Sequence, residues 1–98
     1  MELFKHLFDQ ITEEYHDAEK YMRCALKHKD TDRELADSYY TLARQELAHA
    51  ETLQHHLMRH VKAHDAHDPI HHIYGFAHDR FLDMKKDVRT MTDTYDGK

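Results

Sequence analysis

The sequence contains little glycine, proline or cysteine. Its 98 residues include two glycines, one proline and one cysteine. Glycine and proline are the residues that most often interrupt helices, so this composition, with 34% charged residues, favours long helices over a sheet. We therefore expect almost no strand. The single Cys24 excludes an intrachain disulfide and a cysteine metal cluster.

Long apolar runs and an excess of positive charge are also missing. No run approaches the roughly 20 apolar residues of a membrane span. The formal net charge of −5 argues against a nucleic acid or a membrane surface as partner. The segment from Met1 to His6 lacks the basic and then apolar regions of a signal peptide. We therefore predict a cytoplasmic protein, with neither nucleic acid nor membrane as a partner.

Apolar residues recur every three or four positions in three segments, which predicts three helices. We expect these helices at 2–29, 32–66 and 69–92, all within one domain that covers residues 1–98. The short polar break between the first two forces an antiparallel hairpin, in which Thr31 followed by Glu34 predicts a capping box. The tail from Asp93 is expected to fray. A core of this size is thin for a monomer, which favours an oligomer.

The second segment contains the motif Glu46-x-x-His49 within a strong helical pattern. Residues three apart lie side by side on a helix. Both side chains are predicted to point the way of an apolar stripe formed by Leu35, Tyr39, Leu42, Ala43, Ala50, Leu53 and Leu57. An unpaired carboxylate in such a stripe would cost several kcal/mol or take up a proton. The pair therefore suggests a bound cation.

A third candidate ligand, Glu14, interrupts the apolar row of the first segment. It lies roughly 15 residues before the predicted turn, and Glu46 lies roughly 15 residues after it, at about 1.5 Å per residue along each helix. In an antiparallel hairpin the two carboxylates are therefore level. The sequence predicts a metal site formed by Glu14, Glu46 and His49.

These residues carry a resemblance to a known family. Glu14-x6-Tyr21 followed by Glu46-x-x-His49-Ala50 is similar to the pattern of the ferritin-like superfamily, and within it of half-size members such as encapsulated ferritins. The similarity covers residues 10–55. It implies that two hairpins dimerise into a ferritin-like four-helix bundle with a di-iron centre at the twofold interface, two iron ions per homodimer. An encapsulin shell is a further implied partner, and would place the protein within a protein compartment, although the tail contains no segment similar to an encapsulin-docking peptide.

The same resemblance implies a role for each residue. Glu46 would bridge or chelate the metal, Glu14 and His49 would be terminal ligands, and Tyr21 would form a hydrogen bond that orients them. These ligands would carry the catalytic oxidation of Fe(II) to Fe(III) by dioxygen or peroxide, as in a ferroxidase that handles or stores iron. Mixed oxygen and nitrogen ligands suit iron and would also accept manganese or zinc.

Histidine is abundant, with twelve residues, nine of them between His49 and His78. His56, His60 and His64 are spaced by four on one helix face, where paired imidazoles can chelate divalent metals. This segment suggests an alternative function, the non-redox binding or sequestration of a divalent metal. A solvated face that titrates near pH 6.5, or a staging site for iron, explains the same spacing.

Two further alternatives concern residues around the predicted ligands. Glu13, His16 and Asp17 are expected to face outward, either as a solvated face or as a second staging site for iron. If Glu46 and His49 paired only with each other or with neighbours such as Arg44, the chain would be a structural helical assembly protein. Such a protein would contain no metal.

Overall fold

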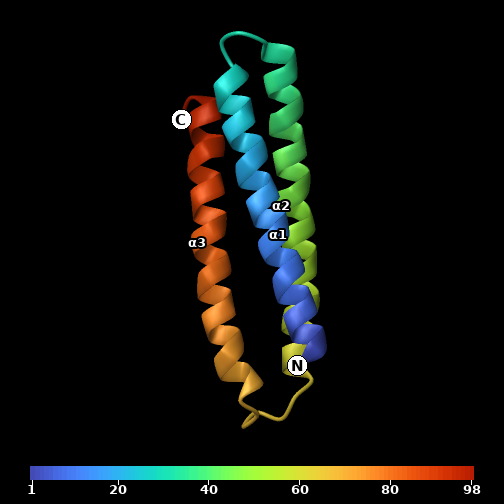
Figure 1. Cartoon of the computed structure of the whole chain (residues 1–98). Coiled ribbons are helices and arrows are strands. Elements are labelled where there is room, and N and C mark those ends of the chain that lie inside the picture. Colours follow the sequence, from blue (N-terminus) through green and yellow to red (C-terminus); the bar gives the residue numbers. More distant parts are fainter.

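The computed structural model describes all residues, 1–98, and consists of three helices and no strands. They are α1 (Glu2–His28), α2 (Arg33–Lys62) and α3 (Ile70–Asp96). The helices lie side by side in a bundle that measures 54 × 21 × 14 Å, with the α1–α2 turn at one end and the α2–α3 connection at the other (Figure 1). The predicted all-α class is confirmed. No helix has the length and apolar character that a membrane crossing would require.

The buried residues repeat every seven positions. On α2 the buried row consists of Ala36, Ala43, Ala50 and Leu57, and on α1 the matching row consists of Phe4, Ile11, Ala18 and Ala25. A seven-residue repeat is typical of helices that pack at a small crossing angle. Alanine leaves little side chain between the helices, so the two backbones of the hairpin approach closely. α3 packs along α1 more closely than along α2.

The core row of α1 differs from the prediction at one position. We expected residue 14 to be the next core position after Ile11, but the next buried residue is Tyr15, which is 1% exposed. The Tyr15 ring packs against Phe81 of α3, with ring centroids 6.2 Å apart, and its hydroxyl donates a hydrogen bond to Gln54 of α2. Because Tyr15 occupies the core, Glu14 lies at the edge of the α1–α2 seam.

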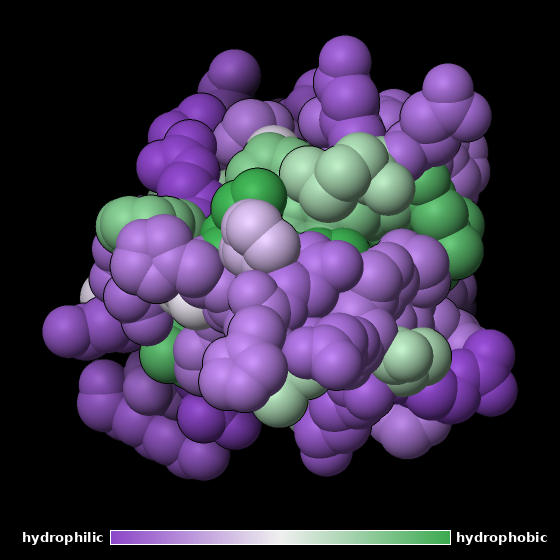
Figure 2. Space-filling model, turned by 90° about the horizontal axis from the view of Figure 1, so that it is seen from below, coloured by the Kyte–Doolittle hydropathy of each residue, from purple (hydrophilic) through white to green (hydrophobic).

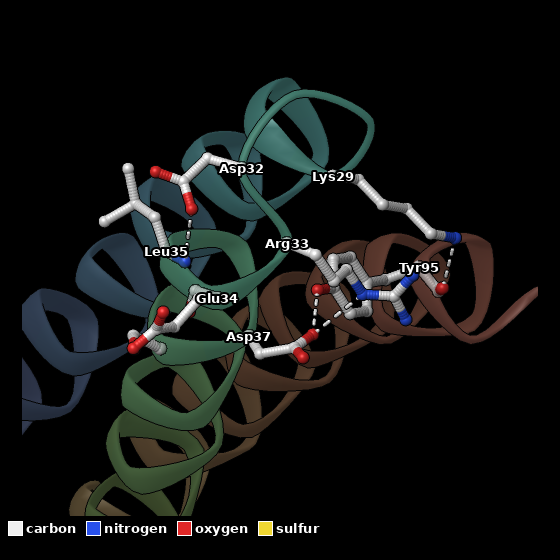
Figure 3. A network of polar contacts seen from close by, with 8 residues as sticks. Lys29, Asp32, Arg33, Glu34, Leu35, Asp37 and Tyr95 are labelled. Atoms are coloured by element: carbon white, nitrogen blue, oxygen red, sulfur yellow. Dashed lines mark hydrogen bonds and ion pairs between the residues drawn. The ribbon is translucent and has the colours of Figure 1, made fainter.

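The α1–α2 turn is held by polar contacts. Asp32 caps α2 by accepting a hydrogen bond from the Leu35 N–H at 3.1 Å, so the predicted cap at Thr31 was wrong by one residue. Asp37 accepts hydrogen bonds from Arg33 of the same helix and from the Tyr95 hydroxyl of α3 (Figure 3). These contacts attach the end of α3 to the start of α2.

Helices α2 and α3 also end at residues other than those predicted. α2 ends at Lys62 rather than near residue 66. α3 continues to Asp96, so the expectation of a frayed tail from Asp93 was wrong. Tyr95 is buried, and burial of an aromatic ring stabilises the last turn. Gly97 then ends the helix with a φ of +79°, a conformation that glycine adopts without strain.

Candidate metal centre

The hairpin brings Glu14 of α1 together with Glu46 and His49 of α2, in agreement with the predicted register. The Nδ1 atom of His49 lies 3.6 Å from Glu14 Oε2 and 3.7 Å from Glu46 Oε1. One potential ligand atom from each residue lies within 4.8 Å of the other two. No other group of three histidine, cysteine or carboxylate side chains in the chain converges in this way.

The three side chains differ in their exposure. The carboxylates are mostly buried, with 22% of the Glu14 side chain and 19% of the Glu46 side chain exposed, whereas His49 is 60% exposed. Glu14 Oε2 is buried and has no hydrogen-bond partner. A buried carboxylate oxygen without a partner is costly, and a cation is one group that would satisfy it. The donor set therefore fits a divalent metal ion, and the site is open on the His49 side.

The electrostatics of the two carboxylates depend on their proximity. The close approach of the Glu14 carboxyl group is the largest cause that raises the pKa of Glu46 to about 7, with further contributions from burial and from the charge of Glu14. The positive charge of protonated His49 acts in the opposite direction. Two carboxylates this close do not readily ionise together, because like charges repel in a partly buried site. A divalent cation would neutralise both.

Asp17 also contributes to this site, contrary to the prediction that it faces outward. It lies one turn after Glu14 on α1, its side chain is half-buried, and its negative charge adds to the increase in the pKa of Glu46. The spacing of three residues from Glu14 was the sequence signal that indicates a shared face. Glu13 and His16 are exposed, as expected.

Tyr21 does not have the contact that the resemblance implies. Its ring stacks against Tyr39 of α2, with centroids 6.2 Å apart, and its hydroxyl forms no hydrogen bond with any of the three candidate ligands. Its position is two turns along α1 from Glu14, on the same side of the hairpin. Within one chain, Tyr21 therefore packs beside the site and does not orient a ligand.

The histidine-rich segment is arranged differently from the metal candidate. The rings of His60 and His64 contact each other edge to face, with centroids 4.9 Å apart, but no third ligand joins them. His64 Nδ1 lies 3.0 Å from the carbonyl oxygen of His60, and His71 Nε2 lies 3.0 Å from that of Asp65. One of these carbonyls lies in the last turn of α2 and the other in the α2–α3 connection, and each also accepts a hydrogen bond from a backbone N–H.

A row of exposed residues extends from the candidate ligands along α2. Leu35, Leu42 and His49 follow one another at seven-residue intervals, and the two leucines are 39% and 38% exposed. The helix α3 does not cover this row, because it contacts the other side of the hairpin through residues such as Tyr15, Tyr40 and Glu51. The candidate ligands therefore lie on a hairpin face that includes exposed apolar side chains.

No protein-family model matches the sequence, and neither a curated protein nor a solved structure matches the chain. A function is therefore inferred from the residues of the site and from their geometry.

Proposed function

We propose that this chain is a di-iron carboxylate protein that oxidises Fe(II) to Fe(III) at a site shared by two copies of the chain. The observation that carries the proposal is the convergence of Glu14, Glu46 and His49, from two helices, at the open face of the hairpin. The buried oxygen of Glu14 that lacks a partner supports a cation at this position.

The ligand count supports a shared site. One chain supplies two carboxylates and one imidazole, which is half of the set found in ferritin-like di-iron bundles. In those bundles two helices each supply a glutamate and the other two each supply a Glu-x-x-His motif. Two hairpins related by a twofold axis would supply four helices and the complete set. Carboxylates and neutral imidazoles suit Fe(II), and they leave coordination positions for an oxidant.

The exposed face supports dimerisation. Leu35 and Leu42 continue the row of His49, so a second hairpin placed on this face would bury them around the ligands. Burial of apolar area contributes about 25 cal/mol per Å², which favours association. The interface would also cover His49, the most exposed of the three ligands.

The chemistry balances with iron as the substrate. Two Fe(II) ions lose one electron each, and dioxygen takes both electrons with two protons to give hydrogen peroxide. With peroxide as oxidant, two electrons and two protons give two waters. The protein would hold the ions side by side, and Glu46, with its raised pKa, would release its proton when a cation binds.

An anaerobic Fe(II) titration followed by exposure to air tests the proposal. Near-ultraviolet ferric absorbance would be measured for the wild type and for Glu46→Ala/His49→Ala, with Glu51→Ala/His56→Ala as the matched control. The control also removes one carboxylate and one imidazole from α2. We expect saturation at about one iron per chain, with fast oxidation in the wild type and the control and none in the site variant.

Dimerisation is tested separately by sedimentation of wild type and Leu42→Glu. The added charge should prevent the dimer and reduce iron oxidation by about tenfold or more, because each half-site would lack the other's ligands. If the site binds zinc or manganese as well as iron and does not oxidise iron, the protein would be a metal-sequestering protein and not an oxidase. Equal binding by the site variant and the wild type would refute the ligand assignment itself.

A further inference from the structure

An apolar groove lies between the first two turns of α1 and the first turns of α3, away from the candidate metal centre. Hydrophobic surface gathers on one side of this end of the bundle, within a mostly hydrophilic surface (Figure 2). The groove has a cavity volume of about 550 Å³, and most of its lining is apolar: Met1, Phe4, Phe8, Ile73, Phe76 and Ala77. Phe76 is 67% exposed, so its ring is available to a ligand.

Two cationic side chains complete the lining, Lys5 of α1 and Arg80 of α3. Neither forms an ion pair within the chain, in which only Arg23, Arg33 and Lys85 of the 14 lysines and arginines are paired. No acidic residue lines the groove. The groove therefore combines a large apolar wall with local positive charge.

The dimensions of the groove favour a small ligand over a helix. Its lining on α1 spans Met1–Phe8 and on α3 spans Ile73–Arg80, which is about 12 Å along each helix. A docked amphipathic helix is held by anchors over several turns, and further along α1 the same side presents Thr12 and Glu19. A cavity of this volume, mostly apolar and with a few polar groups, has the form of a small-molecule site.

We propose that this groove binds a single-chain amphiphile with a carboxylate head group. The aliphatic chain would lie against the rings of Phe8 and Phe76, and the carboxylate would bind Arg80 and Lys5. A guanidinium group matches a carboxylate in geometry as well as in charge. This site is independent of the proposed iron oxidation, because the groove lies on α1 and α3 and shares no residue with Glu14, Glu46 and His49.

Titration with decanoate tests the proposal, monitored by calorimetry and by amide chemical shifts in a heteronuclear NMR spectrum. We expect saturable binding with shifts at Phe8, Phe76 and Arg80. Phe76→Ser should raise the dissociation constant about tenfold, since it removes one apolar wall from the ligand. Arg80→Gln should raise it about threefold, the size of one partly exposed ion pair.

The matched controls are Leu82→Ser and Lys86→Gln, which change an exposed leucine and an exposed lysine of the same helix outside the groove. Both should bind decanoate within about twofold of the wild type. Circular dichroism would show that Phe76→Ser stays folded, as expected for a side chain that is mostly exposed.

Several results would overturn the proposal. These are the absence of saturable binding, equal binding of decyltrimethylammonium, and equal binding by Phe76→Ser. Binding to phosphatidylglycerol vesicles without binding of decanoate would identify a membrane contact instead. Self-association that Phe76→Ser abolishes would identify a second copy of the chain as the occupant.

Discussion

Two regions of this molecule are rich in residue types that can ligate metals, and these residues are arranged differently in the two regions. Glu14, Glu46 and His49 come from two helices and converge within 4.8 Å. His56 and His60 lie on α2 and His64 lies just beyond its last residue, Lys62, and only the rings of His60 and His64 meet. Ligands on two packed helices are held together by the core, whereas His64 and His71 contact nearby backbone carbonyls.

The comparison shows why the density of ligands in a sequence is a poor guide to a site. The histidine-rich segment has more imidazoles, but His64 and His71 contact backbone carbonyls in the last turn of α2 and in the α2–α3 connection. A buried polar atom without a partner occurs in both regions, at Glu14 Oε2 and at His60 Nε2. The convergence of three ligands from two helices, and not the count of ligands, distinguishes the candidate site.

The largest expected effect comes from removing one converging ligand. Glu14→Ala should weaken Fe(II) binding about 100-fold or more, because loss of an outer hydrogen-bonding partner already costs about 10- to 100-fold in metal sites. Glu13→Ala, the exposed neighbour, is the matched control and should bind as the wild type does. Calorimetric titration under anaerobic conditions measures both, and equal losses in the two variants would contradict the assignment.

A change in the core should affect the site without touching a ligand. Ala50→Leu adds a large side chain to the closely packed seam next to His49, and should reduce the free energy of unfolding by about 1–3 kcal/mol. It should also weaken metal binding, because the two helices move apart. Urea unfolding measures the first effect and titration the second. Ala48→Leu, at an exposed position of α2, should change neither.

The pH dependence of stability and of metal affinity should reflect the titration of Glu46. The pKa of Glu46 is raised from 4.5 to about 7, so the folded metal-free protein holds this proton more tightly than the unfolded chain does. The free energy of unfolding should therefore fall as the pH rises from 4.5 towards 7, and then level off with respect to this group. Metal affinity should rise over the same range, because the ligand must lose its proton.

Glu46→Gln is the variant that tests this dependence. Urea unfolding at a series of pH values should show that the decline in stability above pH 4.5 is smaller in Glu46→Gln than in the wild type. Glu13→Gln should behave as the wild type. An unchanged pH profile in Glu46→Gln would show that another group carries the dependence.

The histidine contacts at the end of α2 should have a smaller effect. His71→Ala removes the contacts of its ring with the carbonyls of His64 and Asp65, and should reduce the free energy of unfolding by about 0.5–1 kcal/mol. Iron binding should not change. His67→Ala, whose side chain is exposed, is the control for thermal unfolding, and equal destabilisation of the two variants would show that the His71 contacts do not stabilise the connection.

The smallest effect is expected from the segment with the most imidazoles. Replacing His56, His60 and His64 together by glutamine should leave the rate of iron oxidation within about twofold, because these rings complete no three-ligand group. Stopped-flow absorbance measures this rate. A large loss of iron binding in this variant would show that the histidine-rich segment binds the metal, and would favour the metal-sequestering alternative.

Much of the candidate site was predictable from the sequence because it depends on two periodicities. The three-residue spacing of Glu46 and His49 fixes their shared face, and the equal distances of Glu14 and Glu46 from the turn fix their level. The three-residue spacing of Asp17 from Glu14 also indicated a shared face, although Asp17 was predicted to face outward, whereas the position of Tyr21 was not predictable. The position of Tyr21 depends on the rotation of α1 about its own axis, in which Tyr15 faces the core.

The sequence by itself determined that the chain is helical, where the hairpin turns and that Glu14 lies opposite Glu46, because these follow from composition, apolar period and helix rise. The tertiary structure decided which side chains are buried. It placed α3 against the side of the hairpin opposite the ligands, bound the histidine rings to backbone carbonyls and left an apolar groove beside Lys5 and Arg80. These outcomes depend on contacts between segments far apart in the chain, which local periodicity does not encode.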